Sequence, residues 1–149
     1  AWQAQRSVQR DQADAGKHFD IPVRIISLEL LNELPCQRGD DLRFRLRIEN
    51  ASSDLPFHIS FSIKMQNGYG VFATGTHLIG HSPLRGRDHE ILITYPKIPL
   101  MGGFYNAHAR IFDDQGLMIY HEKILNEFEV KKDSLELGVC YLENNWSIG

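Results

Sequence analysis

The chain has 149 residues, of which 42% are hydrophobic and 23% charged, and its formal net charge is −3. This length suits one domain, and the slightly acidic balance gives no reason to expect nucleic-acid or membrane binding. No apolar run approaches the ~20 residues of a membrane span, and the first residues lack the apolar core of a signal peptide. Cys36 and Cys140 are too few and too far apart for a disulfide scaffold or metal knuckle, so a cytoplasmic domain with two thiols is expected.

Residues 1–21 are polar, with apolar side chains only at scattered positions, which is typical of a linker or short helix leading into a domain. They contain no glycine-rich phosphate loop, so no nucleotide chemistry is expected there. A chain that begins in this way is interpreted as a fragment whose partner domain lies upstream.

From Pro22 onward, short segments with alternating apolar and polar residues follow one another. Strands are predicted over residues 23–31, 41–50, 57–66, 71–76, 89–95, 105–111, 117–121 and 124–130, with a last short strand at 139–142. A bulge is expected at Ile25-Ile26, where the alternation slips, and turns are expected at Asn67-Gly68 and Asp113–Gly116. The pattern predicts an all-β fold, an antiparallel β-sandwich of Ig-like or jelly-roll type.

Catalytic and metal-binding groups form no recognisable arrangement. His77 and His81 lie four residues apart, but Gly80 lies between them in a predicted strand end and loop, so the helical spacing of two metal ligands is missing. Glu127 and Glu129 share the wet face of a strand, where carboxylates are usually solvated, and no serine lies in a strained elbow. The chain is therefore expected to be non-catalytic, with no metal and no cofactor.

Polar and aromatic side chains gather on strands that could share one sheet. Residues 57–66 and 105–111 each alternate apolar and polar side chains, so each strand has one dry and one wet face. Amide, imidazole and guanidinium groups hydrogen-bond sugar hydroxyls, and aromatic rings pack on sugar C–H faces. The candidate carbohydrate-binding residues are His58, Ser60, Ser62, Lys64, Asn106, His108, Arg110, Tyr120, His121 and Trp146. Two alternatives stay open: an ordinary solvated sheet face, and a core position for Trp146.

Four segments carry a family resemblance. They read Phe57-His-Ile-Ser-Phe-Ser-Ile-Lys64, Asn67-Gly-Tyr-Gly-Val-Phe-Ala-Thr-Gly-Thr76, Leu100-Met-Gly-Gly-Phe-Tyr105 and Asn126-Glu-Phe-Glu-Val130. In this order they are similar to the C-terminal domain of Wzt-type proteins, the ATP-binding subunits of ABC transporters that export O-antigen polysaccharide. The resemblance covers about residues 22–130, and residues 138–146 resemble the family's C-terminal extension.

This resemblance implies that residues 22–149, with an extension from about residue 131, form an Ig-like β-sandwich that binds the non-reducing terminal modification of the finished glycan and couples chain termination to export. It implies a missing upstream ATPase domain and a homodimer, for which exchange of C-terminal strands is one route. It also implies a membrane-spanning transporter subunit as partner of the full-length protein, at the inner face of the bacterial inner membrane. The cations expected on the wet face, Lys64, His108, Arg110 and His121, favour an acidic cap. An Ig-like protein-interaction module is the alternative.

Overall fold

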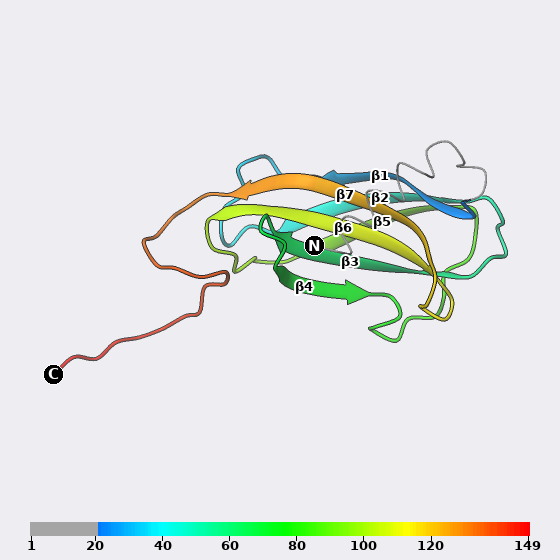
Figure 1. Cartoon of the computed structure of the whole chain (residues 1–149). Coiled ribbons are helices and arrows are strands. Elements are labelled where there is room, and N and C mark those ends of the chain that lie inside the picture. Colours follow the sequence, from blue (N-terminus) through cyan, green and yellow to red (C-terminus); the bar gives the residue numbers. More distant parts are fainter. Residues whose placement is uncertain (1–20) are drawn as a thin grey trace.

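The computed structural model describes residues 21–149, which form two β-sheets (Figure 1). The strands are β1 (Val23–Leu30), β2 (Leu42–Asn50), β3 (Phe57–Met65), β4 (Gly70–Gly75), β5 (Asp88–Tyr95), β6 (Gly103–Asp113) and β7 (Ile119–Val130). One sheet has the order β1-β2-β5 and the other β4-β3-β6-β7, and all neighbouring strands are antiparallel. The predicted antiparallel β-sandwich is confirmed. Apart from Ile21, the predicted linker lies outside the described residues.

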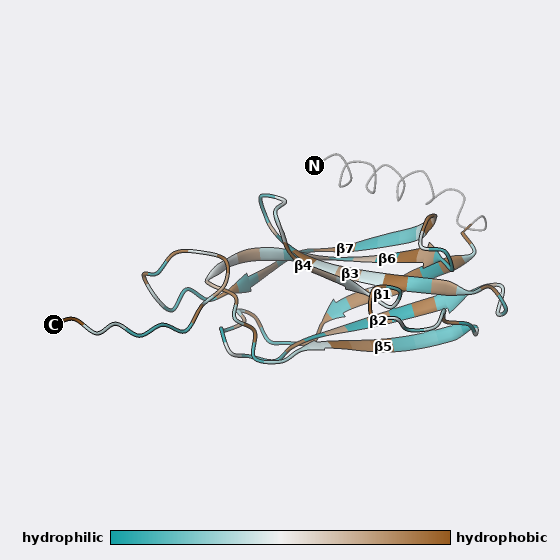
Figure 2. Ribbon diagram, turned by 90° about the horizontal axis from the view of Figure 1, so that it is seen from below, coloured by the Kyte–Doolittle hydropathy of each residue, from teal (hydrophilic) through white to brown (hydrophobic). Residues whose placement is uncertain are grey.

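The core lies between the two sheets, which Figure 2 shows as two layers. The alternation predicted for β2, β3 and β6 holds in the structure, because the inward side chains of each strand are buried. The aromatic ring of Phe44 in β2 lies 4.8 Å from the ring of Phe61 in β3 and 5.9 Å from the ring of Phe128 in β7. These rings join the two sheets at the centre of the sandwich.

Two strand predictions need correction near the C-terminus. The segments predicted as separate strands at 117–121 and 124–130 form the single strand β7, which pairs with β6 along its length. The β6–β7 pair stays continuous through register shifts at two points, between Tyr105 and Ala107 and between Ile111 and Phe112. The short strand predicted at 139–142 does not form; this segment contributes one isolated bridge, between Cys140 and Leu100.

The two edges of the sandwich differ. At one edge β1 lies against β7, and the backbone N–H of Ile25 donates a hydrogen bond of 2.9 Å to Nδ1 of His121. The bulge predicted at Ile25-Ile26 is confirmed there, as a register shift between Ile25 and Ser27. The other edge is formed by β4 and β5, the outermost strands of their sheets.

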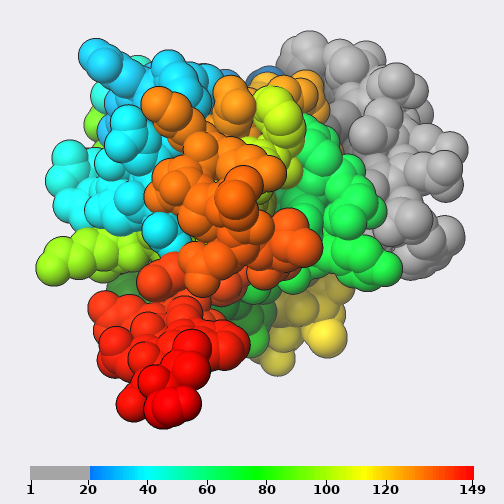
Figure 3. Space-filling model, turned by 90° about the vertical axis from the view of Figure 1, so that its left-hand side faces the viewer, coloured from blue at the N-terminus to red at the C-terminus, as the bar shows by residue number. Residues whose placement is uncertain are grey.

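After β7 the chain leaves the sandwich. Its last residues extend away from the strands, as the red end of the ribbon shows in Figure 1, and they gather at one end of the molecule in Figure 3. Within residues 21–149, no helix is long and apolar enough to cross a bilayer.

Candidate functional site

The polar sides of β3 and β6 lie next to each other, as the sequence predicts. Ser60 lies opposite Arg110, Ser62 opposite His108 and Lys64 opposite Asn106 in this antiparallel pair. Because side chains alternate between the two faces of a sheet, all of these residues project to the side away from the core. We call this surface the outer face. Its residues are Ser60, Ser62, Lys64, Asn106, His108 and Arg110.

His108 is a buried neutral group within the outer face. The residue is only 7% exposed, and its Nε2 lies 2.9 Å from Oδ1 of Asn106. Burial, with a further contribution from the nearby cations Lys64 and Arg110, lowers the pKa of His108 to about 4. The neutral ring therefore donates its Nε2–H to Asn106 at pH 7. This leaves Nδ1 as an acceptor and the Asn106 amide N–H groups as donors.

Arg110 is paired with a carboxylate that sequence reasoning missed. Glu122 in β7 lies opposite Arg110, and its Oε1 is 2.6 Å from Arg110 Nε. The two side chains are only 5% and 16% exposed, respectively. The contact is an ion pair rather than a well-directed hydrogen bond, since the Nε–H has no partner in hydrogen-bond geometry among residues 21–149. Sequence reasoning had no signal for it, because Glu122 lies outside the predicted return strand 117–121 and comes to lie across from Arg110 through a register shift in the β6–β7 pair.

Lys64 is the cation of the outer face that has no ion-pair partner within residues 21–149. The side chain is partly buried, and this burial lowers its pKa. The nearby Arg110 acts in the same direction, whereas Glu122 acts against it. A positive group held at a sheet surface in this way can donate charge-assisted hydrogen bonds to an incoming ligand.

His58 lies at one end of the same side of β3, opposite Phe112. It is buried, its Nδ1 lies 2.8 Å from Oγ1 of Thr76, and its ring centre is 5.5 Å from that of His77. Burial, followed by the neighbouring His77, lowers the pKa of His58. The contact with Thr76 ties this histidine to the end of β4, so its imidazole is already engaged within the fold.

Other predicted site residues lie elsewhere. The prediction that His121 joins the outer face is wrong, because a register shift in the β6–β7 pair places it opposite the core residue Ile111 and against β1. Tyr120 packs against the hydrophobic core instead of standing free on the face. Trp146 is 82% exposed in the C-terminal tail and donates its indole N–H to Asn144 Oδ1, so it does not plug the core.

These positions change the charge expected on the outer face. Of the cations that favour an acidic ligand, His108 is neutral, Arg110 is balanced by Glu122 and His121 is absent from the face. The positive charge of Lys64 remains. The outer face is therefore mainly a hydrogen-bonding surface with one positively charged side chain, that of Lys64.

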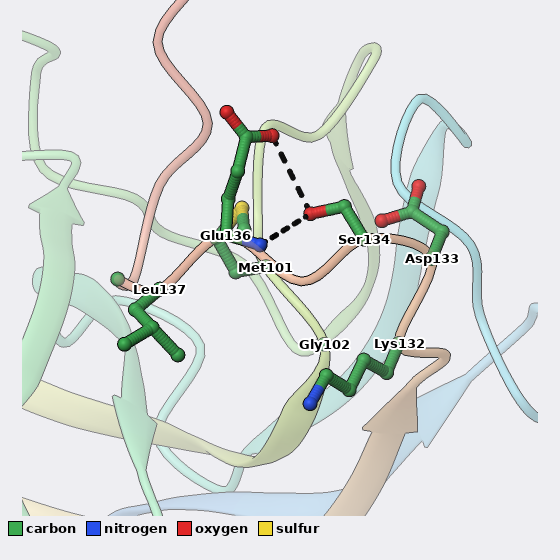
Figure 4. A pocket seen from close by; sticks show the side chains of 8 residues that line it. Met101, Gly102, Lys132, Asp133, Ser134, Glu136 and Leu137 are labelled. Carbon is green, nitrogen blue, oxygen red and sulfur yellow. Dashed lines mark hydrogen bonds between the residues drawn. The ribbon is translucent and has the colours of Figure 1, made fainter.

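A small separate hollow of about 130 Å³ lies where the chain after β7 passes the Met101-Gly102 segment (Figure 4). Ser134 Oγ accepts a hydrogen bond of 3.1 Å from the backbone N–H of Glu136 and lies 3.4 Å from the carboxylate of the same residue. The hydrogen-bonding groups of Ser134 and Glu136 in this hollow are therefore paired with each other. Within residues 21–149, no cluster of three or more His, Cys, Asp or Glu side chains is arranged to hold a metal ion.

No protein-family model and no curated protein matches this sequence. Among solved structures, the crystal structure of the C-terminal domain of wzt is similar, with a TM-score of 0.68 and 13% identity over 86% of this chain and 84% of that chain. A calcium-binding mutant of Bacteroides uniformis β-glucuronidase 2 has a TM-score of 0.48 and 7% identity, over 69% of this chain and 14% of its own. The CARDB domain of the PF1109 protein from Pyrococcus furiosus has a TM-score of 0.46 and 11% identity, over 74% and 87%. The resemblance indicated by the sequence is confirmed at the level of the fold: the chain has the β-sandwich of the C-terminal domain of wzt.

Proposed function

We propose that this chain is a non-catalytic carbohydrate-binding domain that recognises the non-reducing end of an O-antigen polysaccharide and couples chain termination to export. The observation that carries the proposal is the outer face, where polar side chains of the hydrogen-bonded strands β3 and β6 lie side by side. The fold shared with the C-terminal domain of wzt supports the same role.

The chemistry of the outer face suits a saccharide end. Asn106 offers amide donors, His108 offers Nδ1 as an acceptor, and Ser60 and Ser62 offer hydroxyls that can do both. Sugar hydroxyls also donate and accept, so paired hydrogen bonds can form across such a surface. Lys64 fits one anionic substituent, such as a phosphate ester or the carboxylate of a keto-sugar acid. We therefore propose a terminal modification with a single acidic group.

The proposed assembly follows from the same family resemblance. Residues 1–21 would link this domain to an upstream ATPase domain, and a membrane-spanning transporter subunit would hold the full-length protein at the cytoplasmic face of the inner membrane. A homodimer would bury apolar side chains that the C-terminal tail exposes. Leu142 is 77% exposed, Trp146 82% and Ile148 86%, and exchange of these tails between protomers would cover them.

The experiment that tests this function compares two lysine variants in calorimetric titrations with O-antigen polysaccharide from the strain that encodes this chain. Lys64→Met removes the cation of the outer face, and we expect it to weaken binding at least about 10-fold through loss of a charge-assisted hydrogen bond. Lys131→Met is the matched control, because Lys131 is exposed just beyond β7, and it should bind as the parent does. If both variants bind the polysaccharide with equal affinity, Lys64 is not part of the binding site. Capture of a protein partner without polysaccharide binding would favour the Ig-like interaction module instead.

A further inference from the structure

Phe104 is an exposed aromatic residue next to the outer face, and it was not among the candidate residues predicted from the sequence. It precedes Asn106 by two positions in β6, so both side chains project to the side away from the core. The pairing of β6 with β3 continues to this point, because the backbone N–H of Gln66 donates a hydrogen bond of 3.2 Å to the Phe104 carbonyl. Phe104 is 48% exposed, whereas the neighbouring core residue Tyr105 is 2% exposed. The ring therefore adds an aromatic surface to one end of the outer face.

Charged side chains of opposite sign lie on the two sides of this ring. On β7, Glu129 lies opposite Phe104, and it is exposed between two buried neighbours. On β3, Lys64 lies opposite Asn106. Neither Glu129 nor Lys64 has an ion-pair partner within residues 21–149. A ligand on the Phe104 ring therefore meets a carboxylate on the β7 side and a cation on the β3 side.

The opposite end of the outer face is already engaged within the fold, because Arg110 there is paired with Glu122. Asn106 differs. Its Oδ1 accepts a hydrogen bond from His108, which leaves its amide N–H groups as donors. The groups that can still bind a ligand are thus concentrated at the end of the outer face next to Phe104.

We propose that Phe104 is the stacking platform for the terminal sugar ring, whose acidic substituent points toward Lys64 and whose neutral hydroxyls face Glu129. This inference rests on the proposed function, because it takes the outer face as the saccharide site. The C–H groups on one face of a sugar ring pack against an aromatic ring. A carboxylate accepts hydrogen bonds from hydroxyls and repels an anionic group, so Glu129 favours this orientation over the reverse. The ligand class is a terminal sugar with one face rich in C–H groups and an acidic group at one edge of the ring.

Substitution of Phe104 tests the stacking in calorimetric titrations with O-antigen polysaccharide from the strain that encodes this chain. We expect Phe104→Ala to weaken binding about 10-fold or more, since the apolar face of the sugar stays in water, and Phe104→Trp to bind within about 3-fold of the parent chain. Leu92→Ala is the control, because it removes an exposed apolar side chain from β5 in the other sheet, and it should bind as the parent does. Melting temperatures check that each variant is folded.

Glu129→Ala tests the orientation through the sign of its effect. Loss of the hydrogen-bond acceptor should weaken binding about 3-fold or more, whereas unchanged or tighter binding would overturn the orientation. Equal affinities of Phe104→Ala and the parent chain would overturn the stacking and leave the saccharide function intact. The absence of polysaccharide binding by the parent chain would contradict the proposed function itself, and the stacking with it.

Discussion

His108 makes the stability of the domain depend on pH. Burial and the nearby Lys64 and Arg110 lower its pKa to about 4 in the folded chain, against about 6.5 in the unfolded chain. Between these values the unfolded state binds a proton that the folded state rejects, so the free energy of unfolding falls as the pH is lowered from 6.5 to 4. This residue accounts for at most about 3 kcal/mol of that loss.

Denaturant unfolding between pH 4 and 7.5 measures this effect. We expect His108→Gln, which cannot titrate, to show a flatter pH profile than the parent chain. A residual slope of the same sign should remain, because the pKa of His58 is also lowered by burial. Parallel profiles for parent and variant would mean that His108 is already protonated in the folded state near pH 6.

Glu122 should be a structural residue of the outer face. Glu122→Ala leaves the guanidinium of Arg110 unpaired and mostly buried, and we expect the free energy of unfolding to fall by about 3 kcal/mol. Glu127→Ala is the control on the same strand, because this carboxylate is exposed, and its effect should be below about 0.5 kcal/mol. Equal losses of unfolding free energy in the two variants would show that the Arg110–Glu122 ion pair stabilises the fold no more than an exposed carboxylate does.

The residues of the outer face show which features of the candidate site could be predicted from the sequence alone. Alternation alone placed Ser62 and Lys64 on the wet side of one strand and Asn106 on the wet side of another, because this periodicity is a local property of the chain. The pairing of Arg110 with Glu122 and the displacement of His121 depend on register shifts in the β6–β7 pair. Such shifts depend on tertiary packing, so sequence periodicity does not locate them.

At the scale of elements, the turn before β6 depends on a close approach to the chain after β7. A Cβ added at Gly102 would overlap the Cα of Lys132, a backbone atom that cannot move aside cheaply. Gly102→Ala should therefore lower the free energy of unfolding by about 1–3 kcal/mol. Gly70→Ala in β4 is the control, because a Cβ there meets open space. The result is checked by denaturant unfolding, and a Gly102→Ala variant as stable as the control would contradict the close packing.

Most of the strands could be predicted from the sequence, whereas the residues at which strands begin and end could not. Strong apolar alternation gave β2, β3 and β6 with their inward rows, because each has one buried face. β7 was predicted as two strands, 117–121 and 124–130, and Glu122 fell between them. In the structure Glu122 turns outward to meet Arg110, which only the neighbouring strand could reveal.

At the scale of the whole molecule, the β-sandwich separates two surfaces. β3 presents polar residues on the outer face and apolar residues toward the core. The fold is retained at 13% identity to the C-terminal domain of wzt, because many combinations of apolar side chains can fill a sandwich core. Ligand choice depends on the few polar groups that stand on this scaffold, so it has to be measured on this chain.

The most direct test is a calorimetric titration of the whole chain with two forms of the O-antigen polysaccharide from its own strain, one intact and one lacking its non-reducing terminal residue. Recognition of that terminal residue predicts saturable binding of the intact polysaccharide and an affinity lower by about 100-fold or more for the trimmed form. Equal affinity for the two forms, or no binding of either, would contradict the proposed function.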